Sequence, residues 1–331
     1  MPFTLDLLNA VSLESPGQAW DAVAEYLWAK FSAPLPDKSD GEVVNRDRAI
    51  TELENVLAGA CWDLWHEFDA AVPKASRAVI DFWKATHNGK AVLILDGLSL
   101  RETPWLLEQA KERGYSVAHA GAKGAELPGE TTPFANALGF SQRSALENNG
   151  AGKAHQLGGA TTDAVDLPWR DCIDRLGNAE GVVFWHHWPD SRMHGLSKPG
   201  DGLRALVKET HARLTSDDFW AFVDRLATGR RLVITSDHGY AACGLFSDLD
   251  DKDQQDYMKR VFKNGRCAPP TEDGGWVPPI DLKIESAHGT RQMVLGRRKW
   301  KSPSGYPTLH HGGLSLLEVF VPFIELRKSP S

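Results

Sequence analysis

The sequence predicts an α/β protein whose mostly parallel sheet is covered by helices on both faces. Helical patterns separate three short apolar runs, as expected for parallel strands joined by crossover helices: 91–95, 181–185 and 231–235. Before these runs, residues 15–85 show helical periodicity. We therefore expect a helical N-terminal region over residues 1–88 and an α/β domain over residues 89–331.

The clearest helical pattern of the N-terminal region lies in its second half. Apolar side chains recur there at helical spacing, at Ile50, Leu53, Leu57, Cys61, Leu64 and Phe68. Asn45 or Asp47 is the expected N-cap, and Pro73 interrupts the pattern before another helix at 77–84. Residues 34–41 are expected to form a loop. This region carries no catalytic motif and is a candidate surface for protein partners.

In the α/β region, local patterns predict the remaining elements in chain order. Helices are expected at 104–113, 201–214 and 217–226, and Ser216 is the expected N-cap of the last. Further strands are expected at 115–120, 291–296 and, after a helical turn, within 314–326. Residues 247–279 are polar and rich in Pro and Gly, which indicates an excursion from the sheet, with a lid as one interpretation.

Composition argues against several classes of protein. The chain has 331 residues, a formal net charge of −7, and four scattered cysteines without a C-x-x-C pair. Scattered cysteines do not form a disulfide framework or a cysteine zinc site, and an acidic chain is poorly suited to broad nucleic-acid binding. The sequence has no membrane-spanning apolar run and no signal-peptide pattern. We therefore expect a cytoplasmic protein.

Acidic residues and histidines stand where three of the expected strands end. Asp96 follows the first strand, Asp190 lies in the segment after the second, and Asp237 and His238 follow the third. In an open α/β sheet, ligands bind just beyond the carboxyl ends of the strands. These side chains, although far apart in sequence, should therefore converge.

Two further histidines extend this set of candidate metal ligands. His194 follows Asp190 by four residues, so both side chains face one side of a helix or tight turn. His311 precedes two glycines, which allow a close backbone approach; its neighbour His310 is the alternative. Three Asp and three His fit two divalent ions better than one. Such ligands suit zinc best and also accept manganese.

Four segments together resemble the metal motifs of the alkaline-phosphatase superfamily. They occur in that family's order: Asp96-Gly97, then 189–194, 235–239 and 311–315. The ending, with Glu318 and Val321-Pro322, looks most like the PglZ branch. The resemblance covers about residues 91–326 and implies an alkaline-phosphatase-like fold. Each motif alone is weak, but four in order form a strong joint signal.

The resemblance also implies how the six ligands divide between the two ions. One set is Asp190, His194 and His311, and the other set is Asp96, Asp237 and His238. There is one departure from the pattern. PglZ-type proteins often carry Arg soon after the Asp-Gly pair, whereas here Ser99 follows Leu98 and Arg101 comes two residues later.

A hydroxyl nucleophile is implied between Asp96 and Asp190. Residues 127–134 resemble the family's nucleophile loop, in which Thr131 matches the nucleophile position best. Thr132 is the alternative nucleophile or, beside Thr131, a residue that binds the substrate. A divalent ion that lowers the pKa of the hydroxyl would activate this otherwise weak nucleophile.

The activity implied by the resemblance is that of a two-metal phosphodiesterase or phosphatase. Attack of Thr131 on phosphorus would form a phosphothreonine, which water then hydrolyses. The expected substrate is a phosphate ester, with nucleotides and oligonucleotides as candidates, in a bacterial phage-defence or signalling context. The alternative is a non-catalytic zinc-binding partner in a phage-defence complex.

Three other patterns have two interpretations each. His288 contacts substrate or is an exposed loop histidine. His186 and His187, in an aromatic segment, are packing residues or form contacts with the ligand residues without binding the ion themselves. The basic run 297–301 attracts phosphates or forms a solvated face, and a solvated face is more typical of an acidic protein.

Overall fold

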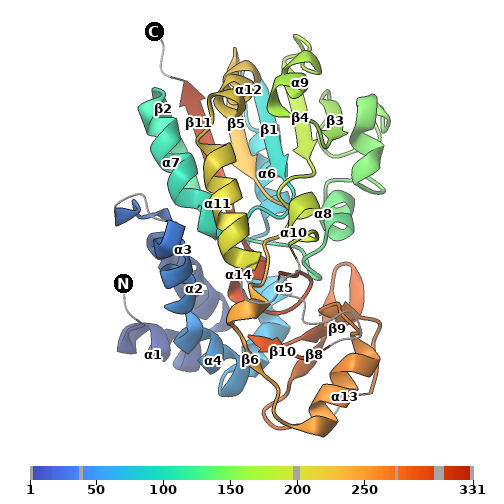
Figure 1. Ribbon diagram of the computed structural model, residues 1–331. Coiled ribbons are helices and arrows are strands. Elements are labelled where there is room, and N and C mark those ends of the chain that lie inside the picture. The colour runs from blue at the N-terminus through green and yellow to red at the C-terminus, as the bar shows by residue number, and fades with distance from the viewer. Residues whose placement is uncertain (1–2, 37–39, 197–201, 273–274, 302–308, 329–331) are drawn as a thin grey trace.

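The computed structural model describes residues 3–36, 40–196, 202–272, 275–301 and 309–328, and a six-stranded sheet lies at its centre (Figure 1). The strand order across this sheet is β2 (Tyr115–Gly124), β11 (Phe320–Lys328), β5 (Arg231–Thr235), β1 (Lys90–Leu95), β4 (Gly181–His186) and β3 (Thr161–Val165). The last four strands run parallel to one another, and β11 is antiparallel to both of its neighbours. The predicted mostly parallel α/β sheet is therefore confirmed.

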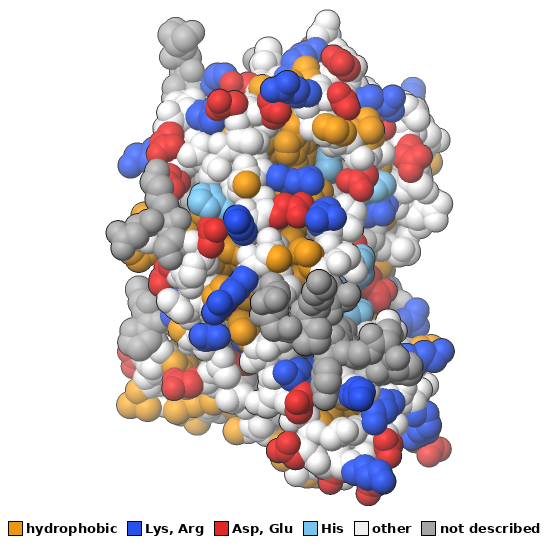
Figure 2. Space-filling view, viewed as in Figure 1, with side chains coloured by type: hydrophobic (Ala, Val, Ile, Leu, Met, Phe, Trp, Pro, Cys, Tyr) orange, Lys and Arg blue, Asp and Glu red, His pale blue; other side chains and the backbone are white. Residues whose placement is uncertain are grey.

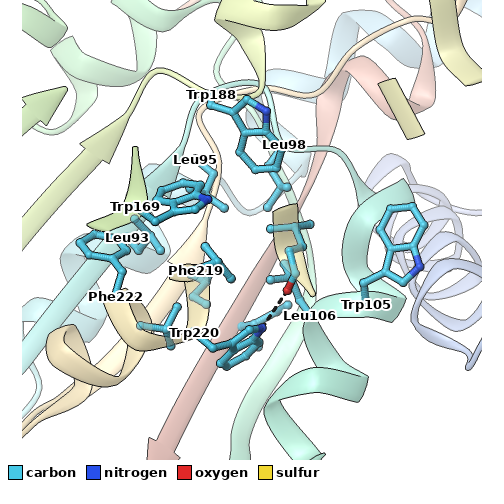
Figure 3. Packing of buried hydrophobic residues seen from close by; sticks show 14 of the residues in the cluster. Leu93, Leu95, Leu98, Trp105, Leu106, Trp169, Trp188, Phe219, Trp220 and Phe222 are labelled. Atoms are coloured by element: carbon cyan, nitrogen blue, oxygen red, sulfur yellow. Dashed lines mark hydrogen bonds between the residues drawn. The ribbon is translucent and has the colours of Figure 1, made fainter. Parts of the chain in front are cut away.

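Helices cover both faces of the sheet. Leu93 and Leu95 of β1 pack on one face against four helices, as Figure 3 shows for part of this core: α7 (Thr103–Glu112), α9 (Trp169–Asp174), α11 (Gly202–Leu214) and α12 (Asp217–Ala227). Val92 and Ile94 pack on the other face against α6 (Ala75–Lys84) and α8 (Thr131–Ala137). Because successive strand residues point to opposite faces, a continuous apolar run is what a strand covered on both sides requires.

The N-terminal helices form a second core beside the sheet. They are α1 (Leu5–Leu13), α2 (Pro16–Ser32), α3 (Asp40–Arg48), α4 (Thr51–Gly59) and α5 (Phe68–Ala71). The Trp20 ring lies 5.0 Å from the Phe68 ring and 6.1 Å from that of Phe320 in β11. This aromatic contact joins the helical region to the sheet. Since α6 covers the sheet itself, the expected boundary at residue 88 stays a prediction.

Some local predictions in this region are wrong. The expected helix across 50–68 is broken, because a 3₁₀ segment (Trp62–Glu67) separates α4 from α5. Asn45 and Asp47 do not cap it, since both lie within α3 and Ile50 directly precedes α4. The expected loop at 34–41 is interrupted by the start of α3, and its residues 37–39 lie outside the described ranges.

The predicted excursion after β5 folds into a small layer of its own. A three-stranded antiparallel sheet has the order β7 (Cys267–Ala268), β9 (Gly289–Val294) and β8 (Asp281–Ser286). Beside it lie the parallel pair β6 (Ser247–Asp248) and β10 (Arg298–Lys299) and the helix α13 (Lys252–Val261). A core that includes Met258, Phe262 and Trp300 holds this layer together. The sequence pattern predicted neither β8 nor β3.

Several elements agree closely with their predictions. The expected helices and strands at 104–113, 217–226, 231–235 and 181–185 match α7, α12, β5 and β4 to within one or two residues. Ser216 caps α12, because its hydroxyl accepts the backbone N–H of Phe219 at 3.2 Å. The final segment forms α14 (Leu316–Val319) and then β11.

The surface mixes both signs of charge. Figure 2 shows Lys and Arg side chains interspersed with Asp and Glu over one face of the molecule. All four cysteines carry free thiols. Among the described residues, no helix combines the length and the apolar character that crossing a membrane requires.

Candidate metal centre

Three strands of the central sheet end side by side, and an aspartate follows each of them. In the parallel register, Leu95 of β1 is paired with His186 of β4, and Ile94 with Thr235 of β5. Asp96 comes directly after β1, Asp237 two residues after β5, and Asp190 begins the short helix α10 (Asp190–Met193). The structure therefore brings together the side chains that the strand ends predicted.

Backbone contacts hold these three strand ends close to one another. The backbone N–H of Asp190 donates to the carbonyl oxygen of Asp96 at 2.9 Å, and that of Gly97 donates to Asp237 Oδ1 at 3.0 Å. Gly97 has a positive φ of 74°, and a Cβ there would lie 3.1 Å from the Cβ of Asp190. Glycine thus permits both the left-handed turn and the close approach.

Asp96, Asp237 and His238 form a fully buried ligand group. His238 Nε2 lies 3.5 Å from Asp96 Oδ1 and 3.5 Å from Asp237 Oδ2, and all three side chains are 0% exposed. None of these three atoms has a hydrogen-bond partner. His238 Nδ1 lies 2.9 Å from the carbonyl oxygen of Gly239, which only accepts, so Nδ1 carries a proton. The lone pair of a neutral His238 therefore points at two carboxylates, as in a metal site.

Asp190 and His311 form a second group, in which His238 again takes part. One ligand atom from each of these three residues lies within 4.8 Å of the other two. His311 Nε2 is 3.5 Å from Asp190 Oδ1, which has no hydrogen-bond partner. The imidazole rings of His238 and His311 stack with centroids 4.0 Å apart. His238 therefore lies between two candidate ion positions.

His194 lies at the edge of the second group. Its Nε2 is 3.2 Å from Asp190 Oδ2, the other oxygen of that carboxylate, and its side chain is 53% exposed. Its ring centroid is 5.6 Å from that of His311. The assignment of His194 as a ligand stays a prediction, and in this structure it is a hydrogen-bond partner of Asp190.

The pKa values of the centre reflect its closely spaced carboxylates. Burial and the neighbouring Asp237 raise the pKa of Asp96 well above its usual value. Burial alone would lower the pKa of His238, but the carboxylates of Asp237, Asp96 and Asp190 raise it to about 9. Burial would raise the pKa of Asp190, but the His194 hydrogen bond and nearby histidines lower it to about 2. Raised pKa values at Asp96 and His238 are what closely spaced carboxylates produce where no cation lies beside them.

Arg143 belongs to the centre and was missed by the sequence analysis. It opens a 3₁₀ segment (Arg143–Asn149), and its guanidinium pairs with Asp96 Oδ2. The indole N–H of Trp185 donates to the same oxygen at 3.1 Å. These donors occupy Oδ2 and leave Oδ1 facing His238. With a side chain 28% exposed, Arg143 is also accessible from solvent.

The predicted nucleophile loop lies against the ligands. His311 Nδ1 donates to the carbonyl oxygen of Gly129 at 3.1 Å, and a Cβ at Gly129 would lie 3.6 Å from that of His238. Thr131 is the first residue of α8, two positions after Gly129, and is partly exposed, while Thr132 is exposed. Both residues stay candidates for the nucleophile.

Three of the other histidines lie outside the two ligand groups. His288 Nε2 lies 3.0 Å from Glu126 Oε2, so its imidazole contacts the residue directly before the predicted nucleophile loop. His310 Nδ1 contacts the backbone of its neighbour His311. His186 packs against Trp169, with ring centroids 4.2 Å apart, which confirms the packing interpretation for this histidine.

Two arginines flagged in the sequence turn out to be buried. Arg101, the departure from the PglZ pattern, donates from Nε to Asp47 Oδ2 at 2.7 Å and is 1% exposed. Arg297 donates to Asp47 Oδ1 at 2.6 Å and is 5% exposed. A solvated face was therefore the wrong expectation for Arg297, because a fully buried carboxylate draws the guanidinium inward.

Together, fold and site define an α/β protein with a candidate two-ion centre at the carboxyl ends of its parallel strands. The chain matches no known family model and no curated protein. Similar solved structures include murine ectonucleotide pyrophosphatase/phosphodiesterase 5 in an inactive form with AMP (11% identity, 73% of this chain, 90% of the other, TM-score 0.45). A second structure of the murine protein, described without inactivation or AMP, is also similar (14% identity, 72% of this chain, 89% of the other, TM-score 0.44). So is the human ectonucleotide pyrophosphatase/phosphodiesterase 5 (12% identity, 72% of this chain, 87% of the other, TM-score 0.42). TM-scores this low do not assign the chain to a family.

Proposed function

We propose that this protein is a two-metal phosphoesterase of the alkaline-phosphatase superfamily, of the PglZ type. The observation that carries the proposal is a set of buried polar atoms without hydrogen-bond partners: Asp96 Oδ1, Asp190 Oδ1, Asp237 Oδ2 and His238 Nε2. Burying such atoms unpaired costs several kcal/mol, roughly 1–3 for each neutral group and more for each charged one. Binding of divalent cations would satisfy them all.

The two ligand groups differ in how completely the protein encloses them. Asp96, Asp237 and His238 are fully buried, whereas Asp190 and His311 are partly exposed. One group would hold its ion from within the protein, and the other would leave coordination positions open to a substrate. Zinc suits the Asp and His ligands best, and manganese is the alternative.

Thr131 is the proposed nucleophile. Its hydroxyl oxygen forms a bond to phosphorus while the bond to the ester's leaving oxygen breaks, and water then hydrolyses the phosphothreonine. When bound, the divalent ions would supply a lowered hydroxyl pKa and charge stabilisation. Arg143 adds a guanidinium beside the centre, where it can stabilise phosphoryl oxygens.

The substrate and context are proposed more broadly. We propose a phosphodiester or monoester substrate, with nucleotides and oligonucleotides as the first classes to test, and a cytoplasmic protein of a bacterial phage-defence or signalling system. Residues 1–88 present the proposed surface for protein partners. Helix α1, whose first and last residues Leu5 and Leu13 are 70% and 77% exposed, contributes apolar area to it.

The test is turnover of bis-p-nitrophenyl phosphate and p-nitrophenyl phosphate with added zinc or manganese. Wild type is compared with Thr131→Ala, Thr132→Ala and His194→Ala. We expect Thr131→Ala to abolish turnover and Thr132→Ala to keep most of it. Turnover that survives in Thr131→Ala but not in Thr132→Ala would move the nucleophile by one residue, and survival in both would refute the mechanism.

Metal content separates the proposal from its alternative. Two ions per chain with turnover would support the phosphoesterase. Bound zinc without turnover of any phosphate ester would favour the non-catalytic partner of a defence complex. No bound divalent ion after reconstitution would refute the metal centre itself.

A further inference from the structure

We propose that His288, through Glu126, positions the nucleophile loop, an inference that rests on the proposed function of that loop. His288 lies in the turn between β8 and β9, far from the ligands in sequence. Its Nε2 lies 3.0 Å from Glu126 Oε2, and because a carboxylate only accepts, this nitrogen donates. The turn of the small sheet thus contacts the chain five residues before Thr131.

Glu126 is held from two sides. Its other oxygen, Oε1, accepts the hydroxyl of Ser76 in the first turn of α6. Glu126 itself is 5% exposed, and the side chain of His288 is 15% exposed. A nearly buried carboxylate with a donor on each oxygen has little freedom to move. Glu126 therefore ties the loop both to α6 and to the small sheet.

A second contact from the same turn holds the next residue. The Ser286 hydroxyl donates to the carbonyl oxygen of Leu127 at 2.6 Å, and the backbone N–H of His288 donates to Ser286 Oγ at 3.2 Å. At the turn's other side, the N–H of Ala287 donates to Asp69 Oδ2 at 3.0 Å. The turn is thus itself anchored to the N-terminal helices, so it can serve as a fixed support.

The backbone of the nucleophile loop connects the turn of the small sheet to the candidate metal centre. Leu127 is followed by Pro128 and Gly129, and the carbonyl oxygen of Gly129 accepts the Nδ1 proton of His311. This hydrogen bond leaves Nε2 of His311 as the ligand atom beside Asp190. A shift of the loop would therefore displace Thr131 and also loosen the His311 ring. His288 is a positioning residue that touches neither substrate nor metal.

The test compares His288→Ala, His288→Gln and Ser286→Ala with wild type, with His119→Ala as control, since His119 is an exposed histidine of β2, outside the turn and the helix that anchors it. Hydrogen exchange over residues 125–134 is measured on metal-free protein. We expect faster exchange in His288→Ala and Ser286→Ala, because local opening needs fewer broken contacts. His288→Gln should stay near wild type, since its Nε2 can donate to Glu126 in place of the imidazole.

Turnover gives the second measurement. We expect kcat to fall about tenfold or more in His288→Ala with KM nearly unchanged, as for other residues that orient a ligand, and His288→Gln to restore most of it. If wild type hydrolyses no phosphate ester but exchange rises as expected, the proposed function fails and the positioning contact stands. Wild-type exchange in both His288→Ala and Ser286→Ala would overturn the inference, as would equal impairment of His288→Ala and His288→Gln.

Discussion

The candidate metal centre and a neighbouring cluster of buried charges differ in how their charges are balanced. The neighbouring cluster, called here the paired cluster, contains three acids and three bases: Asp47, Glu54, Glu318, Arg101, Arg266 and Arg297. In it, Arg266 binds Glu318 with two hydrogen bonds, at 2.7 and 3.0 Å. The candidate metal centre has three aspartates in two adjoining groups, and among the described residues only Asp96 is paired with an arginine, Arg143.

The two regions are directly connected. The segment that carries His311 continues to Gly313, whose backbone N–H donates to Glu318 Oε1 at 2.9 Å. A Cβ at Gly313 would lie 2.7 Å from Arg266 Nε. The difference between these neighbours shows that buried charge alone does not indicate function. Carboxylates that lack counter-charges indicate an external cation, whereas paired carboxylates indicate structural stabilisation.

The largest expected effect on stability comes from the paired cluster. Asp47→Ala would leave the guanidinium groups of Arg101 and Arg297 buried without their shared carboxylate. We expect the free energy of unfolding to fall by about 3–5 kcal/mol, as when one partner of a buried pair is removed. Urea titration measures it, with the exposed Asp63→Ala as control. A loss below about 1 kcal/mol would mean that the cluster is not structural in this sense.

Asp237→Asn is expected to change the free energy of unfolding little and to reduce turnover strongly. In metal-free protein it removes a carboxylate that raises the pKa of Asp96 but that also favours protonated His238. Because these two effects oppose each other, we expect a smaller change in the free energy of unfolding than in Asp47→Ala. Phosphoesterase turnover should fall by more than about 100-fold, since even residues that only orient a ligand cost 10–100-fold. Urea titration in EDTA and p-nitrophenyl ester turnover give the two values. A large loss of metal-free stability would place Asp237 with the paired cluster.

The stability gained on zinc addition should also distinguish the candidate metal centre from the paired cluster. A ligand that binds only the folded state stabilises it by about 2.7 kcal/mol at a concentration of 100 times Kd. We expect wild type and Asp47→Ala to gain similar stability from zinc, because Asp47 lies outside the ligand groups, and Asp237→Asn to gain little. Thermal unfolding with and without EDTA tests this. An equal gain in Asp237→Asn would show that zinc binds elsewhere.

The smallest effect is a pH dependence within the paired cluster. Burial, partly offset by Arg297, raises the pKa of Glu54 from 4.5 to about 7. Between these values the folded protein holds a proton that the unfolded chain has released. Stability linked to this proton is therefore present below pH 4.5 and is lost as pH rises towards 7.

Glu54→Gln removes this titration. Its Oε1 can still accept the N–H of Leu316, which donates to Glu54 Oε1 at 2.7 Å. We expect the loss of unfolding free energy between pH 5 and pH 7.5 to be smaller in Glu54→Gln by about 1–3 kcal/mol. Urea titration in EDTA at both pH values measures the difference. Parallel pH profiles would contradict the expected shift.

The residues of the candidate metal centre were the part of the site that the sequence predicted best. An apolar run followed closely by Asp96 or Asp237 predicts both a buried strand and a polar group at its carboxyl end. Parallel pairing then brings such ends together without further information. The same local signals predicted α7, α12 and the Ser216 cap, since each depends on neighbours in the chain.

Contacts between residues that are far apart in sequence could not be predicted from the sequence. Arg143 stands in a 3₁₀ segment without periodicity, and nothing local shows that it reaches Asp96. Arg297 belongs to a basic run that resembles a surface, but Asp47, far away in sequence, draws it inside. Strand β3, with the sequence Thr-Thr-Asp-Ala-Val, lacks an apolar run because only some of its residues are buried. Burial that depends on distant partners leaves no local pattern.

The place of β11 in the sheet has a consequence for synthesis of the chain. β11 lies between β2 and β5 and supplies the sheet pairing of β2. While the ribosome is still adding residues 320–328, the β2 edge and one edge of β5 have no strand to pair with. Open strand edges can pair with other chains. The nascent protein thus exposes two open strand edges until β11 has been made and has joined the sheet, and the loop that bears His311 is made only shortly before β11.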